Sequence, residues 1–207
     1  MTRSIRAAER RERIIRSAIG VFAEGGYTAA TTAQVAAEAG VSKETIYSYF
    51  GNKAGLLREA LTSLVAAPSG LVPAEPDGVA SADELRARLE SMAMSLTNDL
   101  TQPHYLALSR IVVAETPRDP SLAEMFRDVI AGRVLSAVAR SLTTWQRAGL
   151  VDADVDTAAA ARAFVGPLLT YVLLDGLLRP STDIRRPPAE AVRAQVALLC
   201  RAIARDN

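Results

Sequence analysis

The chain has 207 residues, of which 49% are apolar and 5% aromatic, and its formal net charge at pH 7 is +1. This length and apolar content allow one large domain or two small ones, each with a substantial core. Its single cysteine and single histidine leave no disulfide, no multi-cysteine zinc site and no nucleophile–histidine set, so we expect no catalytic site, metal or cofactor.

Helical spacing of apolar residues recurs along the chain, and alternating strand patterns are absent. We therefore predict an all-α fold of about nine helices. Ser81 and Glu84 have capping-box spacing, and Asp154 or Asp156 caps the eighth helix. The predicted helices lie at about 7–24, 32–39, 43–49, 53–66, 81–100, 103–116, 120–147, 156–178 and 188–205.

Basic residues gather at the N-terminal end. The first sixteen residues contain six arginines and only two acidic residues, Glu9 and Glu12. This clustering fits an end that meets DNA phosphates, and it equally fits a solvated helical face.

Nothing in the sequence predicts secretion or membrane insertion. The first residues contain no apolar segment typical of a signal peptide. The longest apolar run, 163–178, is short for a bilayer span and contains Pro167 and Asp175. With one cysteine, Cys200, the chain fits a reducing compartment, so we expect a cytoplasmic protein.

Residues 31–50, TTAQVAAEAGVSKETIYSYF, contain the signals of two short helices joined by a tight turn. Thr31 and Gln34 have capping-box spacing at the start of the first helix. Gly40 suits the left-handed conformation that ends this helix, and Ser42 can cap the next. The pattern predicts a helix-turn-helix. A corner of two helices without DNA contacts is the alternative.

The second short helix presents a polar face. Ile46 and Phe50 are four residues apart and should face the core. The residues left to face outward or sideways are Lys43, Glu44, Thr45, Tyr47 and Ser48. Lys43 and Tyr47 can reach phosphates or base edges in a major groove. Lys53, which opens the following helix, is a further phosphate-binding candidate.

The run GGYTAATTAQVAAEAGVSKETIYSYFGNKAGLL, residues 25–57, resembles the DNA-binding signature of TetR-family transcriptional regulators. The resemblance implies phosphate contacts from Thr31, Thr32, Tyr47, Tyr49 and Lys53, and base contacts from Lys43, Glu44, Thr45 and Ser48, with Ser42 on the same surface. Glu44 departs from the family pattern, which has a small residue there. Since a carboxylate can accept a hydrogen bond from cytosine N4, we hypothesise that Glu44 contributes to sequence choice.

The resemblance also implies two domains. Residues 1–52 would form the three-helix DNA-binding domain, and 53–207 a larger helical bundle for effector binding and dimerisation, with the helix at 53–66 connecting them. The proline- and glycine-rich segment at 68–78 is the one clear linker. Because the helix at 156–178 is apolar nearly all round, we expect it to form a homodimer interface with the helix at 188–205. Both helices could instead be internal core.

Several C-terminal residues combine apolar bulk with a few hydroxyls, as suits a pocket for a small hydrophobic effector. The candidates are Met92, Leu96, Tyr105, Leu108, Ser109, Val112, Phe126, Trp145, Phe164, Leu168 and Tyr171. Each could equally be an ordinary core residue. Glu115 and Asp175 could bind an effector or pair with an arginine.

The sequence therefore predicts a ligand-responsive DNA-binding repressor. Its homodimer would bind a palindromic operator in double-stranded DNA and be released by a small effector. The alternative is a helical small-molecule-binding protein or enzyme without DNA binding. Duplex binding that weakens steeply as salt rises would distinguish the two.

Overall fold

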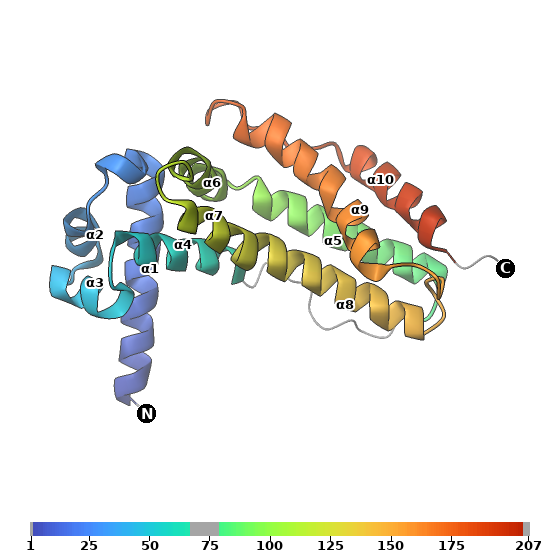
Figure 1. Ribbon diagram of the computed structural model, residues 1–207, viewed down its shortest axis with the longest axis horizontal. Coiled ribbons are helices and arrows are strands. Elements are labelled where there is room, and N and C mark those ends of the chain that lie inside the picture. Colours follow the sequence, from blue (N-terminus) through green and yellow to red (C-terminus); the bar gives the residue numbers. More distant parts are fainter. Residues whose placement is uncertain (1, 67–78, 205–207) are drawn as a thin grey trace. The chain divides into compact units, whose positions relative to one another are not determined.

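The computed structural model describes residues 2–66 and 79–204, which contain ten α-helices and two π-helical segments (Figure 1). No strand occurs among them, so the all-α prediction is confirmed. The predicted linker at 68–78 lies outside the described residues. The chain divides into two compact units. Unit 1 is residues 1–65 with 103–129, and unit 2 is residues 66–102 with 130–207.

Unit 1 contains the helix-turn-helix. Its helices are α1 (Thr2–Ala29), α2 (Thr32–Ala39), α3 (Lys43–Phe50), α4 (Lys53–Ala66), α6 (Pro103–Glu115) and α7 (Pro120–Phe126). α1 packs against α2 and α6, and α2 packs against α3 (Figure 1). The core combines side chains from four helices, among them the fully buried Ile14, Ile46, Leu57 and Leu108.

Unit 2 is a helical bundle in which α9 is central. Its helices are α5 (Ala82–Leu100), α8 (Arg133–Arg147), α9 (Thr157–Tyr171) with the π-helical η2 (Val172–Leu177), and α10 (Ala189–Ile203). α9 packs against α5, α8 and α10. Leu89, Trp145 and Phe164 are buried in its core.

Helix boundaries differ from expectation at two places. The first helix begins at Thr2, and helical geometry breaks only at Gly26, with φ 70° and ψ 168°, before a last turn that ends at Ala29. The prediction ended this helix at residue 24 because Gly25 and Gly26 follow. One glycine in a helix costs only about 1 kcal/mol, so Gly25 does not end it. The predicted long helix at 120–147 is divided by the π-helical η1 (Arg127–Gly132), which makes ten α-helices instead of nine.

Most predicted caps are confirmed. Asp156 caps α9 by accepting hydrogen bonds from the backbone N–H groups of Ala158 and Ala159, so the alternative cap at Asp154 is wrong. Ser81 caps α5 as expected, through the backbone N–H of Glu84. The Glu84 carboxylate accepts from the backbone N–H of Ala80, one residue before the position a capping box would use.

Candidate nucleic-acid interface

The turn between α2 and α3 is held by local hydrogen bonds. Gln34 N–H donates to Thr31 Oγ1 at 3.2 Å, and Thr31 N–H donates to Gln34 Oε1 at 2.8 Å, which completes the predicted capping box. Gly40 ends α2 by adopting a left-handed conformation with φ 62°. Glycine suits this position because the conformation is strained for a residue with a Cβ. Ser42 Oγ accepts from the Thr45 N–H at 3.3 Å and starts α3. The predicted helix-turn-helix geometry is confirmed.

The faces of α3 are separated by burial. Ile46 is fully buried and Phe50 nearly so, as their spacing predicts. The predicted site residues with exposed side chains are Thr31, Ser42, Lys43, Glu44, Tyr47, Ser48 and Tyr49, while Thr45 and Lys53 are half-buried. Thr32 is buried, and its hydroxyl lies 3.4 Å from the Tyr47 hydroxyl. This contact joins the start of α2 to α3 and orients the exposed Tyr47 ring.

A tight connection between α3 and α4 positions Lys53. Asn52 Oδ1 accepts from the Gly55 N–H at 2.8 Å and caps α4. A Cβ at Gly55 would overlap the carbonyl oxygen of Phe50, so only glycine permits this close approach. The connection therefore places Lys53 in the first turn of α4, directly after the end of α3.

Lys53 is held by two residues in the last turn of α1, Tyr27 and Thr28. Its Nζ lies 4.3 Å from the centre of the Tyr27 ring, within cation–π range, and donates to the Thr28 carbonyl oxygen at 3.4 Å. Partial burial lowers the pKa of Lys53, and the nearby Glu115 carboxylate opposes this shift. The contacts restrict the ammonium group to one edge of the helix-turn-helix.

Glu115, at the end of α6, also contacts this segment. Thr28 Oγ1 donates to Glu115 Oε1 at 3.0 Å, and Arg118 lies 3.8 Å from the other carboxylate oxygen. Burial, and then the Asp119 and Glu115 charges, raise the pKa of Tyr27. Sequence reasoning missed Tyr27 and Thr28, because their partners lie far along the chain and no local pattern signals the contact.

The acidic residue on α3 is exposed and ionised. Hydrogen bonds from its own backbone N–H and then from the Ser42 hydroxyl lower the pKa of Glu44. A carboxylate that stays charged can accept hydrogen bonds but not donate them. Glu44 therefore repels phosphates while remaining able to accept from a base amino group.

The eleven effector candidates are divided between the units. Tyr105, Leu108, Ser109, Val112 and Phe126 lie in unit 1, and Met92, Leu96, Trp145, Phe164, Leu168 and Tyr171 lie in unit 2. All are buried except Phe126 and Tyr171, which are half-buried. Burial raises the pKa of the Tyr105 hydroxyl, so it stays neutral. Of the two acids left open, Asp175 lies 3.5 Å from Arg179, and Glu115 has the contacts above.

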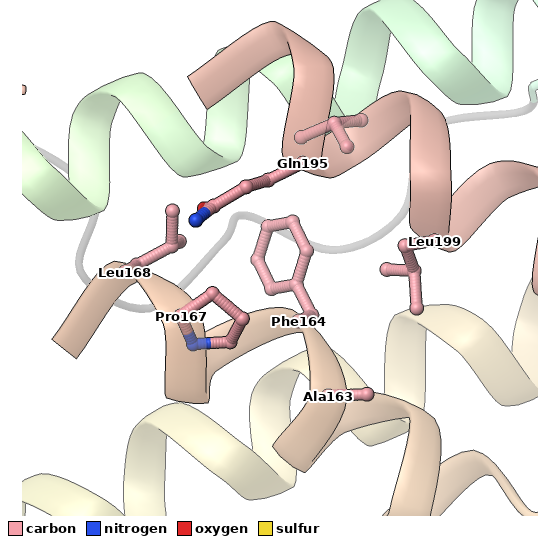
Figure 2. Close-up of a pocket in the computed structure, with 7 residues that line it drawn as sticks. Ala163, Phe164, Pro167, Leu168, Gln195 and Leu199 are labelled. Carbon is pink, nitrogen blue, oxygen red and sulfur yellow. The ribbon is translucent and has the colours of Figure 1, made fainter. Parts of the chain in front are cut away.

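One cavity in unit 2 includes two of these candidates. Figure 2 shows Phe164 and Leu168 of α9 facing Gln195 and Leu199 of α10 across it. The cavity has a volume of about 20 Å³. That is room for one water-sized molecule, whereas ligand pockets typically measure roughly 300–1,000 Å³. Gln195 Oε1 is buried without a hydrogen-bond partner in the described structure.

Two family models together cover most of the chain. The model of bacterial regulatory proteins of the tetR family matches residues 14–60, which contain the helix-turn-helix. The model of the AefR-like transcriptional repressor C-terminal domain matches residues 87–203, more than half of the chain. The chain belongs to the TetR family of transcriptional regulators. The resemblance of residues 25–57 to this family is thereby confirmed.

Curated relatives of this TetR-family protein are helix-turn-helix-type transcriptional regulators. YerO of Bacillus subtilis, which is uncharacterised, is 42% identical over 52 residues, or 25% of this chain and 18% of that protein. The match therefore spans about a fifth of YerO. Mb2274c of Mycobacterium bovis, also uncharacterised, is 28% identical over 177 residues, covering 77% of this chain and 93% of that protein.

Solved structures share the fold over nearly the whole chain. A TetR-family regulator from Mesorhizobium loti has a TM-score of 0.74 at 21% identity, with 96% of this chain and 98% of that chain covered. The transcriptional regulator FadR of Bacillus subtilis, in complex with stearoyl-CoA, has a TM-score of 0.66 at 19% identity, covering 93% and 99%. At these identities the likeness concerns the fold.

Proposed function

We propose that this TetR-family protein is a cytoplasmic, ligand-responsive repressor and not an enzyme. Its homodimer binds a palindromic operator in double-stranded DNA through α3. The observation that carries the proposal is the exposed polar face of α3, which is fixed on a buried base of Ile46 and Phe50. A short helix held in this way can enter a major groove without rearrangement.

The residues on this surface have distinct roles. Backbone N–H groups and hydroxyls at the starts of α2 and α3, with the ammonium group of Lys53, bind phosphates and set the orientation. Lys43, Glu44, Thr45 and Ser48 lie against base edges. Tyr47 and Tyr49 reach the phosphates beside α3. Thr32 acts through its hydroxyl contact with Tyr47 and its place in the first turn of α2.

The homodimer forms through α9, η2 and α10. Four leucines on these segments, Leu169, Leu173, Leu174 and Leu198, and Leu178 directly after η2 are 44–68% exposed. Monomeric proteins rarely expose large contiguous apolar patches, so a second copy is the occupant that fits. Thr157–Leu177 is long and apolar enough to cross a membrane by length and composition alone. Its packing against α5, α8 and α10 accounts for one face of α9 as core, and the exposed Leu169 and Leu173 leave another face for a second copy.

The effector is a small hydrophobic molecule. Support comes from the apolar candidates in α5, α8 and α9, and from FadR, a relative in fold that is solved with stearoyl-CoA. The cavity beside Gln195 is too small for such a molecule, so binding requires the unit 2 helices to separate. An effector that favours the separated arrangement shifts the population of the protein away from the operator-binding arrangement.

Within unit 1, the hydrogen bond from Thr28 to Glu115 connects α6 to the last turn of α1, beside the operator-binding surface.

Selection of genomic duplex fragments by the purified protein tests this function. We expect recovery of a short inverted repeat, with an affinity that falls steeply with salt because phosphate contacts release counterions. A duplex with the repeat scrambled serves as control. Recovery of no common sequence, or equal affinity for the scrambled duplex, would contradict the proposal.

Replacing Glu44 should change sequence preference. In Glu44→Ala, loss of the acceptor should relax selectivity at one base pair of each half-site, by a factor corresponding to about 1–3 kcal/mol. Overall affinity should rise or stay constant, since a negative charge near phosphates is removed. Competition binding with operator variants substituted one base pair at a time measures the effect. Unchanged relative affinities across the set would refute a role for Glu44.

A further inference from the structure

The first turns of α1 form an exposed basic extension. α1 begins at Thr2, and Figure 1 shows its N-terminal part continuing past α2 and α3. The helix-turn-helix needs only the later part of α1 for its core, where Ile14, Ala18 and Phe22 are buried. The preceding turns therefore contribute little to the packing of unit 1.

The arginines in and next to this extension fall into two groups. Arg11 forms an ion pair with Glu59 of α4 and lies 5.8 Å from the centre of the Phe50 ring. Arg13 Nε donates to the carbonyl oxygen of Ala39 at 2.9 Å, at the end of α2. These two side chains hold α1 to the helix-turn-helix. In contrast, Arg6 and Arg10 are exposed and make no hydrogen bond or ion pair among the described residues.

Arg6, Arg10 and Arg13 lie on one face of α1. Their spacings of four and three residues place them one above another in successive turns. The row begins at the turn between α2 and α3, because Arg13 contacts Ala39, the last residue of α2. At 1.5 Å per residue, it continues for about 10 Å from Arg13 to Arg6. Glu9 and Glu12 lie to the side of the row, toward the position of Arg16.

We propose that Arg6 and Arg10 form a second DNA-binding surface, which contacts phosphates of the duplex immediately outside the half-site bound by α3. The row of arginines starts at the turn between α2 and α3, and Arg6 and Arg10 make no hydrogen bond or ion pair among the described residues. Two guanidinium groups spaced in this way match the spaced negative charges of a DNA backbone. The contact adds affinity without reading bases. This inference rests on the proposed operator binding and extends it to the flanking DNA.

The test compares single charge removals at matched positions. Arg10→Gln and Arg6→Gln remove charges from the row. Arg16→Gln removes an exposed charge that lies about 120° around the same helix from Arg10 and makes no hydrogen bond or ion pair among the described residues. Affinities are measured over a salt series on two duplexes, one with long flanks and one trimmed to the edges of the selected repeat. Thermal unfolding by circular dichroism should be the same for all variants, since these exposed side chains make no hydrogen bond or ion pair among the described residues.

On the long duplex, each row variant should lower the slope of log affinity against log salt by about 0.9 per lost phosphate contact, or about 1.8 per dimer. Arg16→Gln should match the wild type. On the trimmed duplex the row variants should bind as the wild type does, because the phosphates concerned are missing. Equal slopes for the row variants and Arg16→Gln on the long duplex would overturn the inference, as would equal losses on both duplexes. Wild-type protein that binds no duplex would instead refute the proposed function.

Discussion

Leu173→Glu should convert the protein to a monomer and weaken operator binding by about 100-fold or more, the scale on which linking two binding modules raises affinity. Leu173 is 44% exposed on η2, near Leu169 and Leu174. A carboxylate at the centre of a dimer interface would be buried without a partner, which is strongly unfavourable. Sedimentation velocity at micromolar concentration and fluorescence anisotropy with the full operator measure the two effects.

Two controls separate dimer loss from general damage. Val113→Glu places the same charge at a 62% exposed apolar side chain on α6, outside the proposed interface, and should leave both mass and affinity unchanged. A duplex carrying a single half-site should bind Leu173→Glu and the wild type alike, because one copy of α3 suffices there. A Leu173→Glu protein that still sediments as a dimer would show that this face is not the interface.

The helix-turn-helix could be predicted from sequence because its signals are local. The Thr31 and Gln34 cap, the left-handed Gly40 and the Ser42 cap each depend on atoms within a few residues. Such contacts form in nearly the same way whatever the rest of the chain does. The burial of Ile46 follows equally directly from helical spacing.

Contacts between distant segments could not be predicted. Arg11 and Glu59 are 48 residues apart, and Thr28 and Glu115 are 87 residues apart. Each pair depends on how whole helices pack, and sequence spacing contains no information on that. As a result, the six N-terminal arginines looked equivalent in the sequence. The structure separates Arg11 and Arg13, which hold α1 in place, from Arg6 and Arg10, which have no hydrogen bond or ion pair with any residue it describes.

The effector candidates illustrate a second limit. Periodicity predicts which side chains are buried, and Leu108 and Trp145 are indeed buried. Burial alone does not distinguish a pocket lining from a packed core, because both are apolar. In the structure the candidates divide between two units, so their shared chemistry gave no information on proximity. That they bind an effector stays a prediction.

Ile46→Ala should abolish operator binding while leaving unit 2 folded. Ile46 is fully buried beneath α3, and removing three carbon atoms there should lower the free energy of unfolding of unit 1 by about 2–5 kcal/mol. Trp145, the single tryptophan, is 2% exposed in the core of unit 2 and reports on that unit alone. Thermal unfolding followed by far-ultraviolet circular dichroism should therefore begin earlier than in the wild type, before tryptophan emission changes.

Ile203→Ala is the matched control, since Ile203 is 3% exposed in α10 and loses the same atoms in unit 2. It should move the Trp145 transition to lower temperature and leave the early part of the circular dichroism curve in place. If Ile46→Ala shifts both signals together, the two units unfold as one cooperative body, because destabilisation of one is then transmitted to the other. In that case α3 and the helices of unit 2 share a single stability, and the proposed effector would act on α3 by stabilising or loosening the whole chain. Separate transitions would instead mean that unit 1 keeps its own stability, so that loosening the helices of unit 2 alone would not unfold α3.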